Sequence, residues 1–138
     1  MKINNVVGWV LLSAALFTLA ACASTNIIAG TWNLISAGPQ NNPIAVVPDS
    51  NSSLTIGQDG KISGSVGCNT LSGNLSISSD QITFGPIAST LMACADPVMV
   101  QEGYVLNILT GTAKFTLENN TLTIINGENI AVFEKEAK

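Results

Sequence analysis

Apolar and polar residues alternate along most of the chain with a period of two, the spacing of strands that bury one face. The alternation is clearest over Leu54–Ile56, Leu75–Ile77 and Phe115–Leu117. Short turn sequences separate these runs, namely Asp59-Gly60, Ser79-Asp80, Asn119-Asn120 and Asn126-Gly127. The pattern predicts a mainly β fold, with about eight strands in one antiparallel meander that forms a small barrel or a strongly curled sheet.

One stretch has helical spacing instead. The apolar and polar positions that follow it are Val98, Glu102, Val105, Leu106 and Leu109. Asp96 is the expected N-cap, Pro97 the first helical residue and Gly111 the terminator. Two other stretches are expected to be irregular. Residues 38–52 contain three prolines and predict a loop with at most a short edge strand at Ile44–Val47, and Ile87–Ala95 is apolar without a clear period.

The N-terminus has the pattern of a secretory signal. Lys2 precedes a mostly apolar run from Val6 to Ala21, too short to span a bilayer comfortably, and the run ends in Leu19-Ala20-Ala21-Cys22. This ending looks like a bacterial lipobox, in which the cysteine is lipidated and becomes the first residue. The alternative is an ordinary signal peptide cut nearby. The expected organisation is a lipoprotein signal peptide over 1–21, a lipidated tether over 22–28 and one domain over 29–138. No Asp follows Cys22, which favours an outer-membrane lipoprotein facing the periplasm of a Gram-negative cell.

Composition and charge exclude several classes of function. The chain carries a net charge of −4 and only 10% charged residues, so it offers no cationic face for nucleic acid. It contains no histidine, which excludes histidine metal sites and histidine-based catalytic triads. Removal of residues 1–21 takes away Lys2 and leaves four lysines against nine acidic residues. We therefore expect no metal, no cofactor, no nucleic acid and no enzymatic activity.

Cys68 and Cys94 are the two cysteines that remain once Cys22 is used for lipidation. In an oxidising periplasm such a pair most simply forms a disulfide, worth about 3 kcal/mol by loop entropy. The alternative is two buried thiols that pack as small apolar groups. A redox-catalytic role is not expected because the two cysteines lack Cys-X-X-Cys spacing.

Several sequence blocks together resemble the META domain family, typified by the bacterial HslJ-type heat-shock proteins. The blocks are Gly30-Thr31-Trp32, Gly64-Ser65-Val66-Gly67-Cys68-Asn69, Ser72-Gly73, Thr83-Phe84-Gly85-Pro86-Ile87-Ala88-Ser89-Thr90 and Met92-Ala93-Cys94. The helix and the final Leu122-Thr123-Ile124 hairpin fall where the family has them, and Glu102 matches a usual helical Glu. Position 91, often Arg in the family, is Leu91 here. The resemblance implies a mostly antiparallel β fold close to the small calycin-like barrels with a packed helix, no enzymatic activity and an association with heat or envelope stress. As structural motif residues it points to Gly30, Trp32, Gly67, Asn69, Ser72, Gly73, Gly85, Pro86, Thr90 and Met92.

Other features have simpler structural explanations. Gly64, Gly67 and Gly73 lack the strand-to-helix context and the lysine of a phosphate loop, and glycines at bulges and barrel bends explain them better. The many serines have no histidine to activate them, and Lys61 and Lys114 are expected to face solvent. Trp32 is expected to plug one end of the barrel, although such a residue could also line a ligand cavity.

Two hypotheses for function remain. The first is a non-enzymatic, lipid-anchored envelope protein that supports stress tolerance, with the membrane held through Cys22 and a periplasmic protein as partner. The second is a binding module, either an inhibitor of a lytic enzyme of the lysozyme type or a small-ligand carrier. An inhibitor would use an exposed loop such as residues 38–52, and a carrier would need an open apolar barrel mouth.

Overall fold

The computed structural model describes residues 26–137. The predicted signal peptide, the lipobox and Cys22 lie outside the described residues, as does Lys138. Within the described part, no helix is both long enough and apolar enough to cross a membrane.

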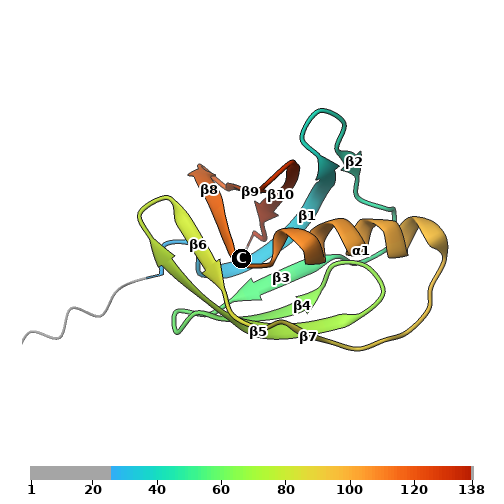
Figure 1. Ribbon diagram of the computed structural model, residues 1–138, viewed down its shortest axis with the longest axis horizontal. Coiled ribbons are helices and arrows are strands. Elements are labelled where there is room, and N and C mark those ends of the chain that lie inside the picture. Colours follow the sequence, from blue (N-terminus) through green and yellow to red (C-terminus); the bar gives the residue numbers. More distant parts are fainter. Residues whose placement is uncertain (1–25, 138) are drawn as a thin grey trace, which may run out of the picture.

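Eight antiparallel strands close into a barrel (Figure 1). They are β1 (Gly30–Pro39), β3 (Ser53–Ile56), β4 (Lys61–Ser65), β5 (Thr70–Ser78), β6 (Gln81–Phe84), β8 (Thr112–Glu118), β9 (Thr121–Asn126) and β10 (Asn129–Lys135). The seam that closes the barrel joins β1 to β10, with Trp32 opposite Lys135 and Pro39 opposite Asn129. Two short strands are added to the wall, β2 (Ile44–Ala45) beside β1 and β7 (Ala88–Ser89) beside β5. The predicted fold class is confirmed, and the barrel closes.

The predicted turns join neighbouring strands where the sequence placed them. Gly60 and Gly127 have φ angles of 80° and 58°, which are the left-handed values that such hairpin turns require. Ser79 and Asn119 also adopt positive φ, and Asn is one of the few non-glycine residues that does so readily. The expected edge strand at 44–47 is shorter than predicted, because only Ile44 and Ala45 pair with β1.

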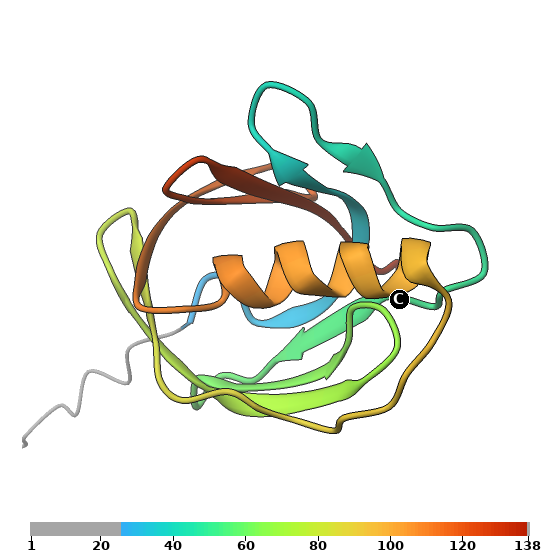
Figure 2. The same ribbon diagram turned by 45° about the vertical axis from the view of Figure 1, so that its right-hand side comes forward.

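The single helix of the described residues, α1 (Asp96–Ile108), lies across one mouth of the barrel (Figure 2). The prediction of Asp96 as N-cap is wrong. Ala95 is the N-cap and offers no side-chain bond, and its carbonyl accepts the amides of Val98 and Met99. Asp96 is therefore already in the first turn, where a carboxylate interacts favourably with the helix dipole. Gly111, with a φ of 57°, follows the helix as expected.

The barrel interior is filled by the side chains that line it. The largest fully buried ones include Trp32, Phe133, Ile62 and Ile82. Trp32 is 0% exposed and donates its indole N–H to the carbonyl of Ile28 at 2.8 Å, so it closes the mouth opposite α1.

The barrel thus has two distinct ends. At the tryptophan end lie Asn26, the β3–β4 turn at 57–60 and the β5–β6 turn at 79–80, and Asn26 is bonded to Gln58 and Gly57. At the helix end lie α1 and the loops 46–52, 66–69 and 90–95. Strand β4 runs from the first end to the second, because it begins after the β3–β4 turn and ends at the 66–69 loop.

Candidate functional site

Two consecutive polar residues of α1 are buried at the helix end. Gln101 is 0% and Glu102 is 4% exposed. The Gln101 Oε1 accepts the amide of Val47 at 2.6 Å, and its Nε2 donates to Ser52 Oγ at 2.8 Å and to the Val66 carbonyl at 2.7 Å. This one side chain therefore fastens the 46–52 loop and the end of β4 to the helix.

Glu102 binds the neighbouring 66–69 loop. Its Oε2 accepts the amides of Cys68 at 2.7 Å and Asn69 at 2.5 Å, and its Oε1 accepts Asn69 Nδ2 at 2.6 Å. Gly67 makes this approach possible, because a Cβ there would lie 2.7 Å from Glu102 Cβ and 2.9 Å from the Val98 carbonyl. The Gly-Cys-Asn sequence is thus explained by close contact between a loop and a helix.

The side chain of Asn69 links the 66–69 loop to the 90–95 loop. Its Oδ1 accepts Thr90 Oγ1 at 2.9 Å and the amide of Met92 at 2.6 Å, while Nδ2 donates to the Met92 carbonyl at 3.3 Å. A disulfide joins Cys68 to Cys94, as predicted, with their Cα atoms 5.9 Å apart. We call Asn69, Thr90, Gln101, Glu102 and this disulfide the clasp. In the described residues, every buried side-chain N or O atom has a hydrogen-bond partner.

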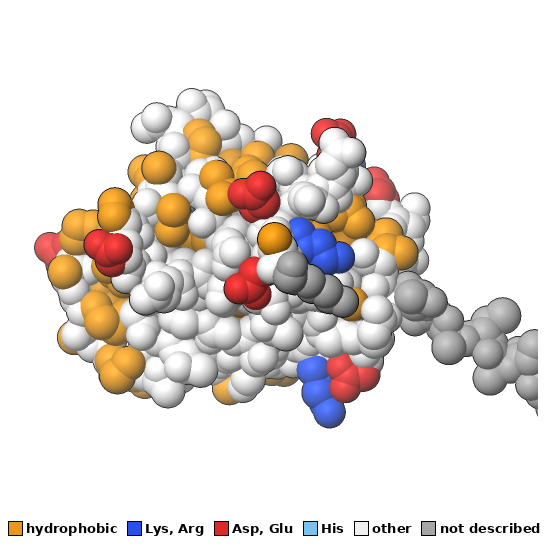
Figure 3. All heavy atoms as spheres, turned by 180° about the vertical axis from the view of Figure 1, so that it is seen from behind, with side chains coloured by type: hydrophobic (Ala, Val, Ile, Leu, Met, Phe, Trp, Pro, Cys, Tyr) orange, Lys and Arg blue, Asp and Glu red, His pale blue; other side chains and the backbone are white. Residues whose placement is uncertain are grey.

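The loop that the clasp holds exposes apolar side chains. Leu91 is 97% exposed and Met92 is 56% exposed, and on the nearby helix Val100 is 50% exposed. Hydrophobic side chains gather at the left of the view in Figure 3, which is the helix end, with acidic side chains among them. The basic side chains of that face lie towards the right. A rigid loop with exposed apolar residues is a candidate contact surface.

Charged residues are divided unequally between the two ends. The three described lysines, Lys61, Lys114 and Lys135, all lie towards the tryptophan end, since they pair with Asn74, Gln81 and Trp32. The helix end carries Asp49, Asp96 and Glu128, all exposed, without a lysine among its described residues. Its exposed surface is therefore apolar and acidic.

A carboxylate with a lowered pKa lies at the tryptophan end. The backbone amide of Lys61 donates to Asp59 Oδ1 at 3.1 Å, and its ammonium group lies 3.3 Å from Oδ2. The hydrogen bond from the Lys61 backbone amide is the main cause that lowers the pKa of Asp59 below its usual value, and the contact with the Lys61 side chain is the second cause. Both residues are exposed and their contact belongs to a turn.

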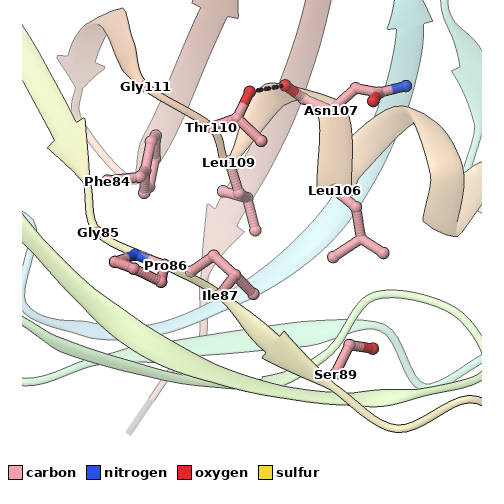
Figure 4. Close-up of a pocket in the computed structure, with 10 residues that line it drawn as sticks. All are labelled: Phe84, Gly85, Pro86, Ile87, Ser89, Leu106, Asn107, Leu109, Thr110 and Gly111. Atoms are coloured by element: carbon pink, nitrogen blue, oxygen red, sulfur yellow. Dashed lines mark hydrogen bonds between the residues drawn. The ribbon is translucent and has the colours of Figure 1, made fainter.

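A second feature is an apolar cleft between the wall and the C-terminal half of α1 (Figure 4). Its volume is about 620 Å³. Ile87, Leu106 and Leu109 point towards one another across it, and Phe84 lies at its back. Ser89, Asn107 and Thr110 supply polar groups at its rim, and the Thr110 hydroxyl donates to the Asn107 carbonyl at 2.7 Å. The cleft exists because Gly85-Pro86 separates β6 from β7 and leaves the wall incomplete beside the helix.

Most of the expected motif residues take part in one of two contacts, the clasp or the packing of β5 against the segment that follows β6. Asn69, Gly67, Thr90 and Met92 belong to the clasp or adjoin it. Gly73 lies against the 86–87 segment, where a Cβ would meet the Pro86 carbonyl at 2.9 Å, and Gly85 donates its amide to Asn74. Gly30 and Trp32 lie at the other end, and Ser72 pairs with Ala88.

Two sets of residues that could have suggested chemistry, the lysines and Gly64, can be located. Lys61 and Lys114 are exposed. Gly64 belongs to β4 and not to a phosphate loop. Glycine is needed there because a Cβ would meet the carbonyl of Ser53. Among residues 26–137, no three His, Cys, Asp or Glu side chains are grouped in a way that could hold a metal ion.

Gln101 is the site residue that sequence reasoning missed. It lies between Val98 and Val105 on the buried side of the predicted helix, and its amide was not recognised as part of the core. A polar residue at a core-facing helical position is the signal that could have identified it, because such a side chain must be hydrogen-bonded.

These features define a class of protein: a small closed antiparallel barrel, plugged by tryptophan at one end and covered at the other by a helix that polar side chains and a disulfide fasten to the loops. The family model of the META domain matches residues 25–137. The chain therefore belongs to the META domain family.

Solved structures share the fold. A protein from Burkholderia xenovorans, determined by NMR, has a TM-score of 0.67 at 20% identity, with 99% of this chain and 100% of that chain covered. A second NMR structure has a TM-score of 0.62 at 24% identity over 77% of this chain and 88% of the other. A crystal structure of an uncharacterized protein from Bacteroides eggerthii has a TM-score of 0.51 at 18% identity, with 78% and 98% covered. The comparison with curated proteins finds no match.

Proposed function

We propose that this META domain protein is a non-enzymatic, lipid-anchored envelope protein that acts by binding another molecule at its helix end. We also propose that, like HslJ-type proteins, it supports tolerance of heat or envelope stress. The observation that carries the proposal is the clasp. It uses the buried polar side chains of the helix end to fix a loop whose own apolar side chains are exposed.

The hydrogen bonds of the clasp favour binding over catalysis. Glu102, Gln101 and Asn69 are the polar groups that a reaction could use, and each is occupied by the chain itself. The described residues contain no nucleophile beside a base. In contrast, a preorganised apolar loop lowers the conformational entropy lost on association, which is what a contact surface requires.

Lipidation at Cys22 is tested by fractionation. The full chain should sediment with membranes, and the Cys22→Ser variant should appear in the soluble envelope fraction because multiple acyl chains provide stable anchoring. A control variant, Ser24→Ala, should remain with membranes. Continued sedimentation of Cys22→Ser would contradict the lipid anchor.

The role in stress is tested by genetics in the organism that encodes the protein. Deletion should reduce survival after heat or after an envelope-damaging treatment, and the intact gene should restore it. Complementation with Cys22→Ser should fail if anchoring is needed. A deletion strain that survives as well as its parent under both treatments would contradict the stress role.

Carriage of a small apolar ligand is a second candidate, and the cleft beside α1 is the observation that favours it. A fluorescent apolar probe, N-phenylnaphthylamine, should bind with increased emission, and Leu106→Trp, which fills the cleft, should abolish the increase. The matched control is Val100→Trp, on the exposed face of the same helix. Equal binding by both variants would exclude the cleft as a ligand site.

A further inference from the structure

We propose that the helix end docks a positively charged protein, with Leu91 and Met92 as the apolar contact and Asp49 and Asp96 as the charged rim. This inference rests on the proposed binding function and names the surface and the kind of partner. Four observations carry it.

The first is the contrast between how firmly the loop is held and how far its side chains are exposed. The backbone of Met92 is bonded to Asn69 through both its amide and its carbonyl. The amide of Thr90 is bonded to the Thr70 carbonyl at 3.0 Å, and Cys94 is covalently joined to Cys68. Between these fixed points Leu91 is 97% exposed. A side chain presented in this way loses little entropy on binding, so it has the properties of an interface anchor.

The second observation is charge. Asp96 opens α1, and Asp49 lies in the loop that Gln101 fastens to the same helix, with a φ of 60°. Both are exposed, and the described lysines lie towards the other end of the barrel. An apolar contact with an acidic rim is complementary to an apolar pocket with a basic rim.

The third observation concerns the membrane. Only residues 23–25 separate the predicted lipidated Cys22 from Asn26, which is fixed at the tryptophan end. Four residue steps reach at most about 14 Å. The tryptophan end therefore faces the membrane on which the chain is anchored, and the helix end faces away from it. That membrane is therefore not the partner that contacts Leu91.

The fourth observation concerns a second copy of the chain. A symmetric contact through the helix end would bring two sets of acidic residues together, at the end where no lysine is described. Like charges in one interface oppose association. A partner of opposite charge fits the surface better than a second copy does.

The experiment uses the full lipidated chain in its own cells. The photoreactive residue p-benzoylphenylalanine replaces Leu91 in one strain, Leu117 in a second and Asn41 in a third. Leu117 is a 36% exposed residue of β8 towards the tryptophan end, and Asn41 is exposed in the β1–β2 loop. After illumination, crosslinked products are identified by mass spectrometry, and the captured protein's net charge is read from its sequence.

The expected result is capture of one positively charged protein from position 91 and not from position 117. Capture should fall about fivefold or more in an Asp49→Asn, Asp96→Asn double variant, and also in about 0.5 M salt, because screening weakens exposed charge contacts. Glu134→Gln, an exposed acid of β10 towards the tryptophan end, is the matched control and should leave capture unchanged.

Other products overturn the inference. These are a crosslinked dimer of the chain, a lipid adduct at position 91, and a captured protein that is acidic or insensitive to the double variant. Capture from position 41 and not from position 91 would leave the binding function standing and move its surface to the β1–β2 loop. No product at any of the three positions would contradict both proposals.

Discussion

At the tryptophan end the barrel is filled by apolar side chains such as Trp32, whereas at the helix end hydrogen-bonded polar side chains and a disulfide are added to the buried apolar residues of α1. The Trp32 side chain makes one hydrogen bond, from its indole N–H to the Ile28 carbonyl, and the Lys135 ammonium group lies 5.4 Å from the centre of its ring. Gln101 and Glu102 together bond to two loops, at Val47 and Ser52 of the first and at Val66 and Asn69 of the second.

The two closures do different things. Apolar filling stabilises in proportion to the area it removes from water and depends weakly on direction. Buried hydrogen bonds contribute less net free energy, but they fix positions because an unsatisfied buried group is costly. The tryptophan end is thus built mainly for stability, and the helix end for the geometry of its loops.

The largest expected effect is at the tryptophan end. Trp32→Ala should lower the free energy of unfolding by about 3–5 kcal/mol, because it removes a fully buried side chain and leaves a cavity. Chemical denaturation measures the change. Trp32→Phe, which keeps much of the apolar volume and loses the bond to Ile28, should cost clearly less. Equal losses of unfolding free energy in the two variants would show that Trp32 stabilises the fold through its hydrogen bond and not through its buried apolar volume.

The disulfide should come next. Cys68→Ser should cost about 3 kcal/mol in oxidising buffer, since the bond closes a loop with a sequence separation of 26. In excess reductant the wild type should lose nearly the same amount, so the difference in melting temperature between the two proteins should almost vanish. A difference that persists in reductant would mean that the thiols stabilise by packing alone.

Glu102→Gln should cost about 2 kcal/mol, because its amide group would meet backbone donors with a donor of its own. The loss should be concentrated in the loops. Hydrogen exchange at Asn69 and Met92 should accelerate, while exchange in β9 and β10 follows only the global stability. Uniform acceleration would show that the clasp has no special control over the loop geometry.

Leu91→Ala should leave stability within about 0.5 kcal/mol of the wild type, since its side chain is 97% exposed. Partner capture from the same cells should nevertheless fall about 30-fold, as expected for an interface anchor. Thermal unfolding and quantitative co-purification measure the two effects. A stability loss comparable to that of Glu102→Gln would place Leu91 in the fold and remove it from the contact surface.

The smallest effect is expected at Asp59. The bonds from Lys61 lower the pKa of this carboxylate, so its contribution to stability is present above its unfolded pKa of about 3.8 and is lost as the pH falls through the lower folded value. The difference in melting temperature between the wild type and Asp59→Asn should therefore shrink as the pH falls below about 3.8. Any difference should appear above pH 4, where the wild-type carboxylate is charged. The opposite pH dependence would contradict the direction of the shift.

The barrel could be predicted from the sequence because its wall follows a simple alternation. Ile62, Ile82 and Phe115 lie on the buried face, and turns such as Asp59-Gly60 provide the positive φ that connects the strands. Closure could not be predicted, because the pairing of β1 with β10 joins residues about a hundred positions apart and no local pattern encodes it.

The clasp could be predicted only in part. The cysteine pair and Asn69 were identified, but the role of Gln101 was not. A search for helical periodicity counts apolar positions, so a buried polar residue only weakens the pattern. The hydrogen-bond partners that explain its burial lie in loops more than thirty residues away. The exposure of Leu91 was equally out of reach, since a run of apolar residues between Ile87 and Ala95 gives no sign of which side chains face outward.

The pairing of β1 with β10 also determines when the barrel can close during synthesis. The first barrel strand cannot acquire its final neighbour until Lys135 of β10 is available to pair with Trp32. A chain still emerging from the ribosome or from an export channel, or one truncated before β10, therefore retains two open sheet edges that can pair with other chains. The barrel can close only after β10 has been made.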